Sequence, residues 1–215
     1  MIKLPHKKAF IFDMDGVIID NIQYHKQALR QFLKAFDLEM DDDYFQKKIN
    51  GRTMQELVLS LIPDASQERI MELTEKKEAL YRDIYQVHLA PTPGLLAFLE
   101  QSSSKGIKMA VATSAISANV DFILDGLNIR KYFDFIIDST MVSKGKPDPE
   151  IYTNAIKGLG MKPEDCLVFE DALAGIEAGK AAGAAVFGLA TSMEPTELPE
   201  GLVGIAKDFQ EIDVH

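Results

Sequence analysis

Pairs of polar side chains that could take part in catalysis stand after four apolar runs of the sequence. They are Asp13 and Asp15, Thr113 and Ser114, Lys144 and Lys146, and Glu170 and Asp171. Carboxylates are ligands that Mg²⁺ prefers, whereas a hydroxyl and an ammonium group can bind the oxygens of a phosphate. A carboxylate can attack a phosphoryl group when a cation offsets the repulsion between the two anions. Together these residue types indicate metal-assisted phosphoryl transfer.

Any one of these side chains could simply be solvated in a loop, because such residues are common there. Their shared position after apolar runs is more informative. In an open parallel sheet, ligands bind outside the carboxyl ends of the strands, where residues far apart in the sequence meet. We therefore expect these polar groups to converge on one crevice.

The elements that must position these groups alternate between strands and helices. Continuous apolar runs predict buried strands at residues 9–12, 107–112, 133–137, 166–169 and 184–189. Helical spacing predicts helices at residues 94–104, 116–127, 149–157 and 172–182, with Pro149 at a first helical position and Gly106, Gly158 and Gly183 closing helices. This alternation is typical of an α/β fold with a doubly wound, Rossmann-like parallel sheet.

One stretch interrupts the alternation, because residues 21–90 show helical periodicity and no convincing strand. Its apolar residues recur at helical spacing: Ile22, Leu29, Phe32, Leu33 and Phe36, then Leu57, Val58, Leu61 and Ile62, and later Ile70, Leu73, Leu80 and Ile84. We expect an all-helical domain at 21–90, inserted into a core formed by 1–20 and 91–215. The Pro-Thr-Pro-Gly segment that ends at Gly94 predicts a stiff return to the core.

Composition and charge disfavour several classes of partner. The 215 residues are 47% hydrophobic and 26% charged, as in an ordinary globular protein. With 33 acidic and 23 basic residues, the net charge of −10 disfavours nucleic acids and anionic membranes. We find no signal peptide and no run of membrane-spanning length, so we expect a cytoplasmic protein and a monomer. Cys166 is the only cysteine, which excludes an intrachain disulfide and indicates a buried strand thiol.

The motifs that contain these polar pairs resemble those of a known family. Asp13-Met14-Asp15-Gly16-Val17 is similar to the DxDGV signature of the haloacid dehalogenase (HAD) superfamily, and it follows an apolar strand as that motif requires. Three further segments resemble the family's later motifs, in order: Val111-Ala112-Thr113-Ser114, Lys144-Gly145-Lys146-Pro147-Asp148-Pro149, and Val168-Phe169-Glu170-Asp171 with the following Ala172-Leu173-Ala174-Gly175-Ile176. The resemblance spans essentially the whole chain and is greatest to the β-phosphoglucomutase-like branch, whose helical cap corresponds to the insert.

The resemblance implies a role for each core motif. Asp13 is expected to be the nucleophile that forms an aspartyl-phosphate, and Asp15 the general acid and base. Asp13, Asp171 and the Asp15 backbone carbonyl would bind Mg²⁺, whereas Glu170 would be a metal ligand or act through water or on Lys146. The phosphoryl group would be held by Ser114 and the Ala115 backbone. Lys146 is preferred to Lys144 as the stabilising cation because it immediately precedes Pro147.

For the cap, the resemblance implies substrate contacts from Arg52 and Thr53, with His25 and Lys77 near the positions of mutase contacts. Alternative interpretations remain open for three of these residues, and Arg52 could simply be solvated. Thr53 could instead be the N-cap of the next helix, and His25 a partly buried helix histidine. A mobile cap would exclude water from the reaction.

The implied function is a magnesium-dependent phosphatase acting on a small phosphorylated metabolite, such as a sugar or polyol phosphate. The alternative is a β-phosphoglucomutase, although Asn21 stands where such mutases usually carry a hinge threonine. A non-catalytic binding protein with the same fold is disfavoured because Asp13 and Asp15 are both intact. A dehalogenase is disfavoured because that reaction needs neither Asp15 nor a magnesium site.

Overall fold

A computed structural model describes residues 1–41, 44–45 and 53–214 of the chain. The chain divides into two compact units, which are described separately below. The core unit consists of Met1–Asp20 with Leu89–His215, and the helical unit consists of Asn21–His88.

The core unit is built on a six-stranded parallel sheet with strand order β4-β3-β2-β5-β6-β7. The strands are β2 (Ala9–Phe12), β3 (Lys108–Ala112), β4 (Phe135–Ile137), β5 (Cys166–Glu170), β6 (Ala185–Leu189) and β7 (Ile205–Ala206). In chain order, β3 and β4 are added on one side of β2, and β5, β6 and β7 are then added on its other side. The predicted doubly wound α/β fold is confirmed, and its switch point lies at β2.

Four α-helices connect these strands: α5 (Leu95–Ser104), α6 (Ser117–Gly126), α7 (Glu150–Gly158) and α8 (Leu173–Ala181). Gly106 follows α5 and Gly183 follows α8. Both glycines have positive φ, the left-handed conformation in which helices commonly end. Two details differ from prediction. Pro149 precedes α7 as its N-cap, and Gly160 rather than Gly158 adopts the positive φ after that helix.

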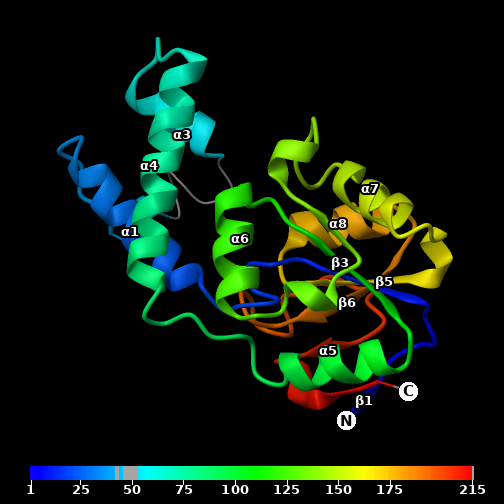
Figure 1. Ribbon diagram of the computed structural model, residues 1–215. Coiled ribbons are helices and arrows are strands. Elements are labelled where there is room, and N and C mark those ends of the chain that lie inside the picture. The colour runs from blue at the N-terminus through cyan, green and yellow to red at the C-terminus, as the bar shows by residue number, and fades with distance from the viewer. Residues whose placement is uncertain (42–43, 46–52, 215) are drawn as a thin grey trace. The chain divides into compact units, whose positions relative to one another are not determined.

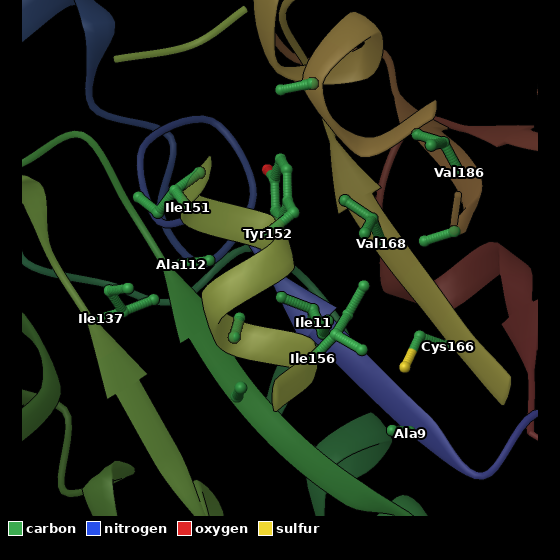
Figure 2. Close-up of a cluster of buried hydrophobic side chains, with 14 of the residues drawn as sticks. Ala9, Ile11, Ala112, Ile137, Ile151, Tyr152, Ile156, Cys166, Val168 and Val186 are labelled. Carbon is green, nitrogen blue, oxygen red and sulfur yellow. The ribbon is translucent and has the colours of Figure 1, made fainter. Parts of the chain in front are cut away.

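Helices cover both faces of the sheet, with α5 on one side and α7 and α8 on the other (Figure 1). On the α7 and α8 side, small and branched strand residues such as Ile11 and Val168 pack against Ile151, Tyr152 and Ile156 (Figure 2). On the opposite side the core is aromatic, and Phe12 stacks on Phe169 with ring centroids 5.0 Å apart. Burial on both faces explains why these strands are continuously apolar.

Short elements complete the core unit. β1 (Ile2–Lys3) and β8 (Ile212–Asp213) pair in parallel and bring the two ends of the chain together (Figure 1). Four 3₁₀ turns lie at η2 (Arg130–Tyr132), η3 (Ser139–Met141), η4 (Pro163–Asp165) and η5 (Phe209–Glu211).

The helical unit contains α1 (Ile22–Lys34), α3 (Met54–Leu61) and α4 (Gln67–Tyr85). Its core contains predicted apolar residues, among them Leu29, Phe32, Leu57 and Leu73. The second half of α4 differs from prediction, because it buries Lys77, Glu78, Tyr81 and Tyr85, whereas Leu80 and Ile84 are only half-buried. No strand occurs among the described residues of this unit.

Within residues 1–41, 44–45 and 53–214, no helix combines the length and apolar composition needed to cross a bilayer.

Candidate active site

Asp13 follows the central strand at the switch point of the sheet. Phe12 is in register with Phe169 of β5, and the Asp13 amide donates to the Phe169 carbonyl over 3.0 Å. This pairing places Asp13 beside Glu170 and Asp171, although more than 150 residues separate them in the sequence. All three side chains are buried. The predicted convergence of the first and fourth motifs is thus present in the structure.

The three carboxylates form one acidic cluster. Each offers an oxygen, and these atoms lie within 4.8 Å of one another. Burial raises the pKa of Asp13 well above its ordinary value; Lys146 opposes the rise, while Glu170, Asp171 and Asp15 add to it. Burial likewise raises the pKa of Asp171 to about 7, with the charge of Glu170 as the next contribution. Burial and the neighbouring carboxylates thus disfavour the ionised form of both side chains.

Lys146 is the cation that reaches this cluster. Its Nζ donates to Oδ1 of Asp13 over 2.7 Å and to Oε1 of Glu170 over 2.6 Å. Although burial favours the neutral amine, the charges of these two carboxylates raise the Lys146 pKa above its ordinary value. Lys144, by contrast, has a side chain that is 70% exposed and lies 3.3 Å from Asp148. The structure thus brings only Lys146 of the two lysines into the site.

Glu170 is held by four hydrogen-bond donors. Oε1 accepts from Lys146 and from the Tyr152 hydroxyl at 2.6 Å, while Oε2 accepts from the backbone amides of Asp171 at 3.0 Å and Ala172 at 3.1 Å. Gly175 leaves the necessary room, because a Cβ there would lie 1.7 Å from Oε1. This arrangement favours Glu170 as the partner of Lys146, one of the alternatives that the sequence left open, over a direct metal ligand.

The loop after β6 contributes residues that the sequence analysis missed. Ser192 donates a hydrogen bond to Oδ2 of Asp171, and Thr191 donates to the Gly16 carbonyl over 2.5 Å. Gly16 has φ +81°, and a Cβ there would lie 2.0 Å from Oδ2 of Asp171. A side chain at position 16 would therefore displace Asp171, which gives this glycine of the first motif a steric explanation. Ser192 belongs to no recognisable motif.

The loop after β3 contains the predicted phosphate-binding residues. Ser114 is exposed, and the Ala115 amide donates to Oγ1 of Thr113 over 3.0 Å. The structure thus gives the Ala115 amide, expected to hold a phosphoryl group, an internal acceptor. Asp15, the expected acid and base, is half-buried two residues beyond Asp13.

Asp138, which follows β4, secures this loop from the side and was also missed. Its Oδ2 accepts from the Ser117 hydroxyl over 2.6 Å, and the Ser139 amide donates to the Ala115 carbonyl over 3.1 Å. Burial opposes ionisation of Asp138, but hydrogen bonds from Ser117 and Thr140 lower its pKa below the ordinary value. The position of Asp138 directly after a predicted strand was the feature of the sequence that could have identified it.

The helical unit brings together two of its predicted site residues. Nζ of Lys77 lies 2.9 Å from Nδ1 of His25 and 2.7 Å from Oε1 of Glu78. Because an ammonium group only donates, Nδ1 of His25 is the acceptor in this contact. The His25 ring stacks on Tyr81 with centroids 3.7 Å apart. The pair borders a cavity of about 150 Å³ that is otherwise lined mainly by apolar side chains of the helical unit.

Thr53 has a structural role in addition to lining this cavity. Its hydroxyl accepts from the Glu56 amide over 3.2 Å, and Oε2 of Glu56 accepts from the Thr53 amide over 2.7 Å. This capping box begins α3, so the N-cap interpretation of Thr53 fits the geometry. Arg52, the other predicted contact, lies outside the described residues.

The donor set suits a hard divalent cation. Asp13, Glu170 and Asp171 offer only oxygen, which matches the ligand preference of Mg²⁺. The raised pKa values of Asp13 and Asp171 indicate that another positive charge beside these groups would be favourable. Since Glu170 already accepts four hydrogen bonds, Asp13 and Asp171 are the better placed pair.

The chain is similar to several known proteins. A family described as haloacid dehalogenase-like hydrolase matches residues 10–189. Beta-phosphoglucomutase of Bacillus subtilis is 37% identical, covering 82% of this chain and 80% of the relative. A phosphorylated carbohydrates phosphatase of Thermotoga maritima is 30% identical, covering 96% and 97%. The crystal structure of a HAD hydrolase of family IA, variant 3, from Entamoeba histolytica superposes with a TM-score of 0.89 at 30% identity, covering 96% of this chain and 95% of that one.

Proposed function

Because the chain belongs to the haloacid dehalogenase-like hydrolase family, as a HAD-type phosphatase of the β-phosphoglucomutase-like branch, we propose that it hydrolyses a small phosphorylated sugar or polyol with Mg²⁺. The observation that carries this proposal is the buried cluster in which Asp13 contacts Lys146 and lies beside Asp171. Such a cluster suits a carboxylate nucleophile that attacks an anionic substrate.

In the first step, a carboxylate oxygen of Asp13 forms a bond to phosphorus while the bond to the leaving oxygen breaks. Asp15 donates a proton to that oxygen, which yields the free alcohol and an aspartyl-phosphate. In the second step, Asp15 accepts a proton from water, whose oxygen attacks phosphorus and releases Asp13. The products are the alcohol and inorganic phosphate.

Lys146 and Ser114 stabilise the phosphoryl oxygens in both steps. The Ala115 amide joins them by exchanging its internal bond to Thr113 for a phosphoryl oxygen. Asp13, Asp171 and the Asp15 backbone carbonyl would hold Mg²⁺, which supplies the charge that lets two anions approach. Glu170 keeps Lys146 in place.

The helical unit supplies the contacts that select the rest of the substrate. His25, Lys77, Thr53 and Arg52 are the proposed contact residues. The first three border the cavity of about 150 Å³, which offers polar donors next to an apolar wall. Such a mixed surface suits the hydroxyl-bearing and carbon faces of a small polyol.

A β-phosphoglucomutase is the second candidate, and the contact between His25 and Lys77 is the observation that favours it. A mutase must keep water from the aspartyl-phosphate until the sugar returns, which requires coupling between the hinge and the chemistry. Asn21, at the first position of the helical unit, donates from Nδ2 to the Tyr81 hydroxyl over 2.5 Å. Its amide is thus directed to α4, which favours hydrolysis over the mutase reaction.

The deciding experiment supplies β-glucose 1-phosphate, a catalytic amount of glucose 1,6-bisphosphate and Mg²⁺, and measures phosphate and glucose 6-phosphate together. We expect phosphate release to exceed isomerisation. Efficient isomerisation with little phosphate would select the mutase. A parallel screen of sugar and polyol phosphates identifies the preferred substrate, and an absence of turnover on every ester would contradict both candidates.

A further inference from the structure

We infer that Tyr152 is a positioning residue for Lys146, acting through Glu170. The inference rests on the proposed function, because it assigns Tyr152 a part in the same phosphoryl transfer. Tyr152 belongs to α7 and is completely buried. In Figure 2 its hydroxyl lies near the carboxyl-terminal end of β5, where Glu170 stands. It is a polar atom in a cluster that otherwise packs apolar side chains.

The Tyr152 hydroxyl and the Lys146 ammonium bind the same oxygen. Both donate to Oε1 of Glu170, each over 2.6 Å. Because both groups donate to one carboxylate oxygen, the position of that oxygen determines where the ammonium group lies. Since the same Nζ donates to Asp13, a fixed Oε1 also fixes the approach of Lys146 to Asp13.

The hydroxyl also fixes the orientation of Glu170. Oε2 accepts from the backbone amides of Asp171 and Ala172. Gly175 lies so close to the carboxylate that any side chain at position 175 would collide with it. With Tyr152 as the fourth donor, every acceptor position of this carboxylate is used. Glu170 therefore presents Lys146 to Asp13 in one arrangement.

The ring of Tyr152 makes a second, separable contribution. Nζ of Lys146 lies 5.0 Å from the ring centroid, within the range of a cation–π interaction. Tyr152→Phe keeps the ring and the packing and removes only the hydroxyl. This substitution therefore isolates the hydrogen bond to Glu170.

The test is a double-mutant cycle of Tyr152→Phe with Lys146→Ala, assayed with an aryl phosphate and Mg²⁺. We expect Tyr152→Phe to lower kcat about tenfold, as for other outer partners of a catalytic group, with KM changed less than about twofold. In the Lys146→Ala background the same substitution should change kcat less than about twofold, because its effect passes through the missing ammonium. A merely structural role would give the same loss in both backgrounds.

Tyr132→Phe is the matched control, since the Tyr132 hydroxyl lies 3.4 Å from Glu100 at the surface and its loss should leave kcat unchanged. Thermal unfolding of each variant verifies that it is folded at the assay temperature. Parental kcat in Tyr152→Phe, or equal losses in both backgrounds, would overturn the inference while leaving the proposed function standing. Failure of the proposed function is a different result, namely a parent protein that hydrolyses no phosphate ester.

Discussion

Lys146 donates a hydrogen bond from Nζ to Oδ1 of Asp13 over 2.7 Å, although 133 residues separate the two in sequence. The bond joins the third motif to the first and holds a positive charge against the proposed nucleophile. In the proposed mechanism the ammonium group is thus already in place for the charge that develops on the phosphoryl oxygens, so that little reorganisation is needed.

Lys146→Ala should lower kcat/KM about 100-fold, because one fixed donor at a developing charge contributes ~3 kcal/mol. Lys144→Ala is the matched control, since the exposed Lys144 contacts only Asp148 among the ion pairs of the described residues. It should change kcat/KM less than about threefold. Steady-state hydrolysis of an aryl phosphate measures both. A larger loss in Lys144→Ala would show that the wrong lysine has been assigned.

Asp13→Asn should lower phosphate release at least ~1000-fold, because an amide keeps the shape of the side chain but cannot act as the anionic nucleophile. The protein should still fold. Asp20→Asn, which makes the same change at an exposed carboxylate, should retain parental activity. Beryllofluoride with Mg²⁺ should inhibit the parent by occupying the phosphoryl position. Near-parental turnover in Asp13→Asn is incompatible with an aspartyl-phosphate.

Removal of divalent cations by EDTA should abolish hydrolysis, and added Mg²⁺ should restore it, because the acidic cluster offers oxygen ligands for a cation that offsets the repulsion between Asp13 and a phosphate. Asp171→Asn should raise the Mg²⁺ concentration for half-maximal activity at least ~10-fold, since a proposed ligand is lost. Isothermal titration calorimetry measures Mg²⁺ binding independently of turnover. Full activity in EDTA-treated protein would exclude the metal from the mechanism.

Lys77→Met should impair hydrolysis of the preferred sugar phosphate about tenfold more than hydrolysis of an aryl phosphate, because only the larger substrate needs contacts from the helical unit. The ratio of the two kcat/KM values within one variant is independent of the folded fraction. Lys76→Met, at the exposed neighbouring position of α4, is the control and should leave the ratio unchanged. Arg52→Ala should change the ratio in the same direction. An unchanged ratio in both Lys77→Met and Arg52→Ala would remove the helical unit from substrate selection.

Cys166 should be unreactive in the native protein. Burial raises the pKa of its thiol to about 11, with the charge of Asp165 as the next cause, and Sγ donates to the Lys162 carbonyl over 3.3 Å. Because the pKa is raised, thiolate appears only toward pH 11, and roughly one molecule in a thousand carries it at pH 8. A disulfide reagent at pH 8 should modify less than about 0.1 equivalent before guanidinium is added and one equivalent after. Rapid native labelling would contradict the burial.

The apolar strands and the motif residues that follow them could be predicted from sequence, because a strand buried on both faces must be continuously apolar and its carboxyl end must hold the ligand. Tyr152 could not. It stands at a helical position that packs in the core, and its hydrogen-bond partner Glu170 is distant in sequence. Ser192 and Asp138 were missed for the same reason, since a hydroxyl or carboxylate in a loop acquires a role only from the neighbour that folding supplies.

Helix α4 shows a different limit of sequence reasoning. Helical spacing alone did not show whether the helix face with Leu80 and Ile84 or the face with Tyr81 and Tyr85 is buried. The structure buries the tyrosines, because Tyr81 stacks on His25 and Tyr85 packs against Tyr24. The strands β1, β7 and β8 also gave no signal, since strands of two residues have no periodicity to detect.

The position of β2 between β3 and β5 has a consequence for how the protein is made. β2 is synthesised before β5, and its pairing with β5 requires residues 166–169. Until those residues emerge from the ribosome, one edge of this wholly apolar strand has no partner from β5, and such long-range parallel pairing is slow. Asp13 meets Glu170 only when the same pairing forms. The nascent chain therefore carries an open hydrophobic edge until β5 has been made, and the proposed catalytic centre forms only with that pairing.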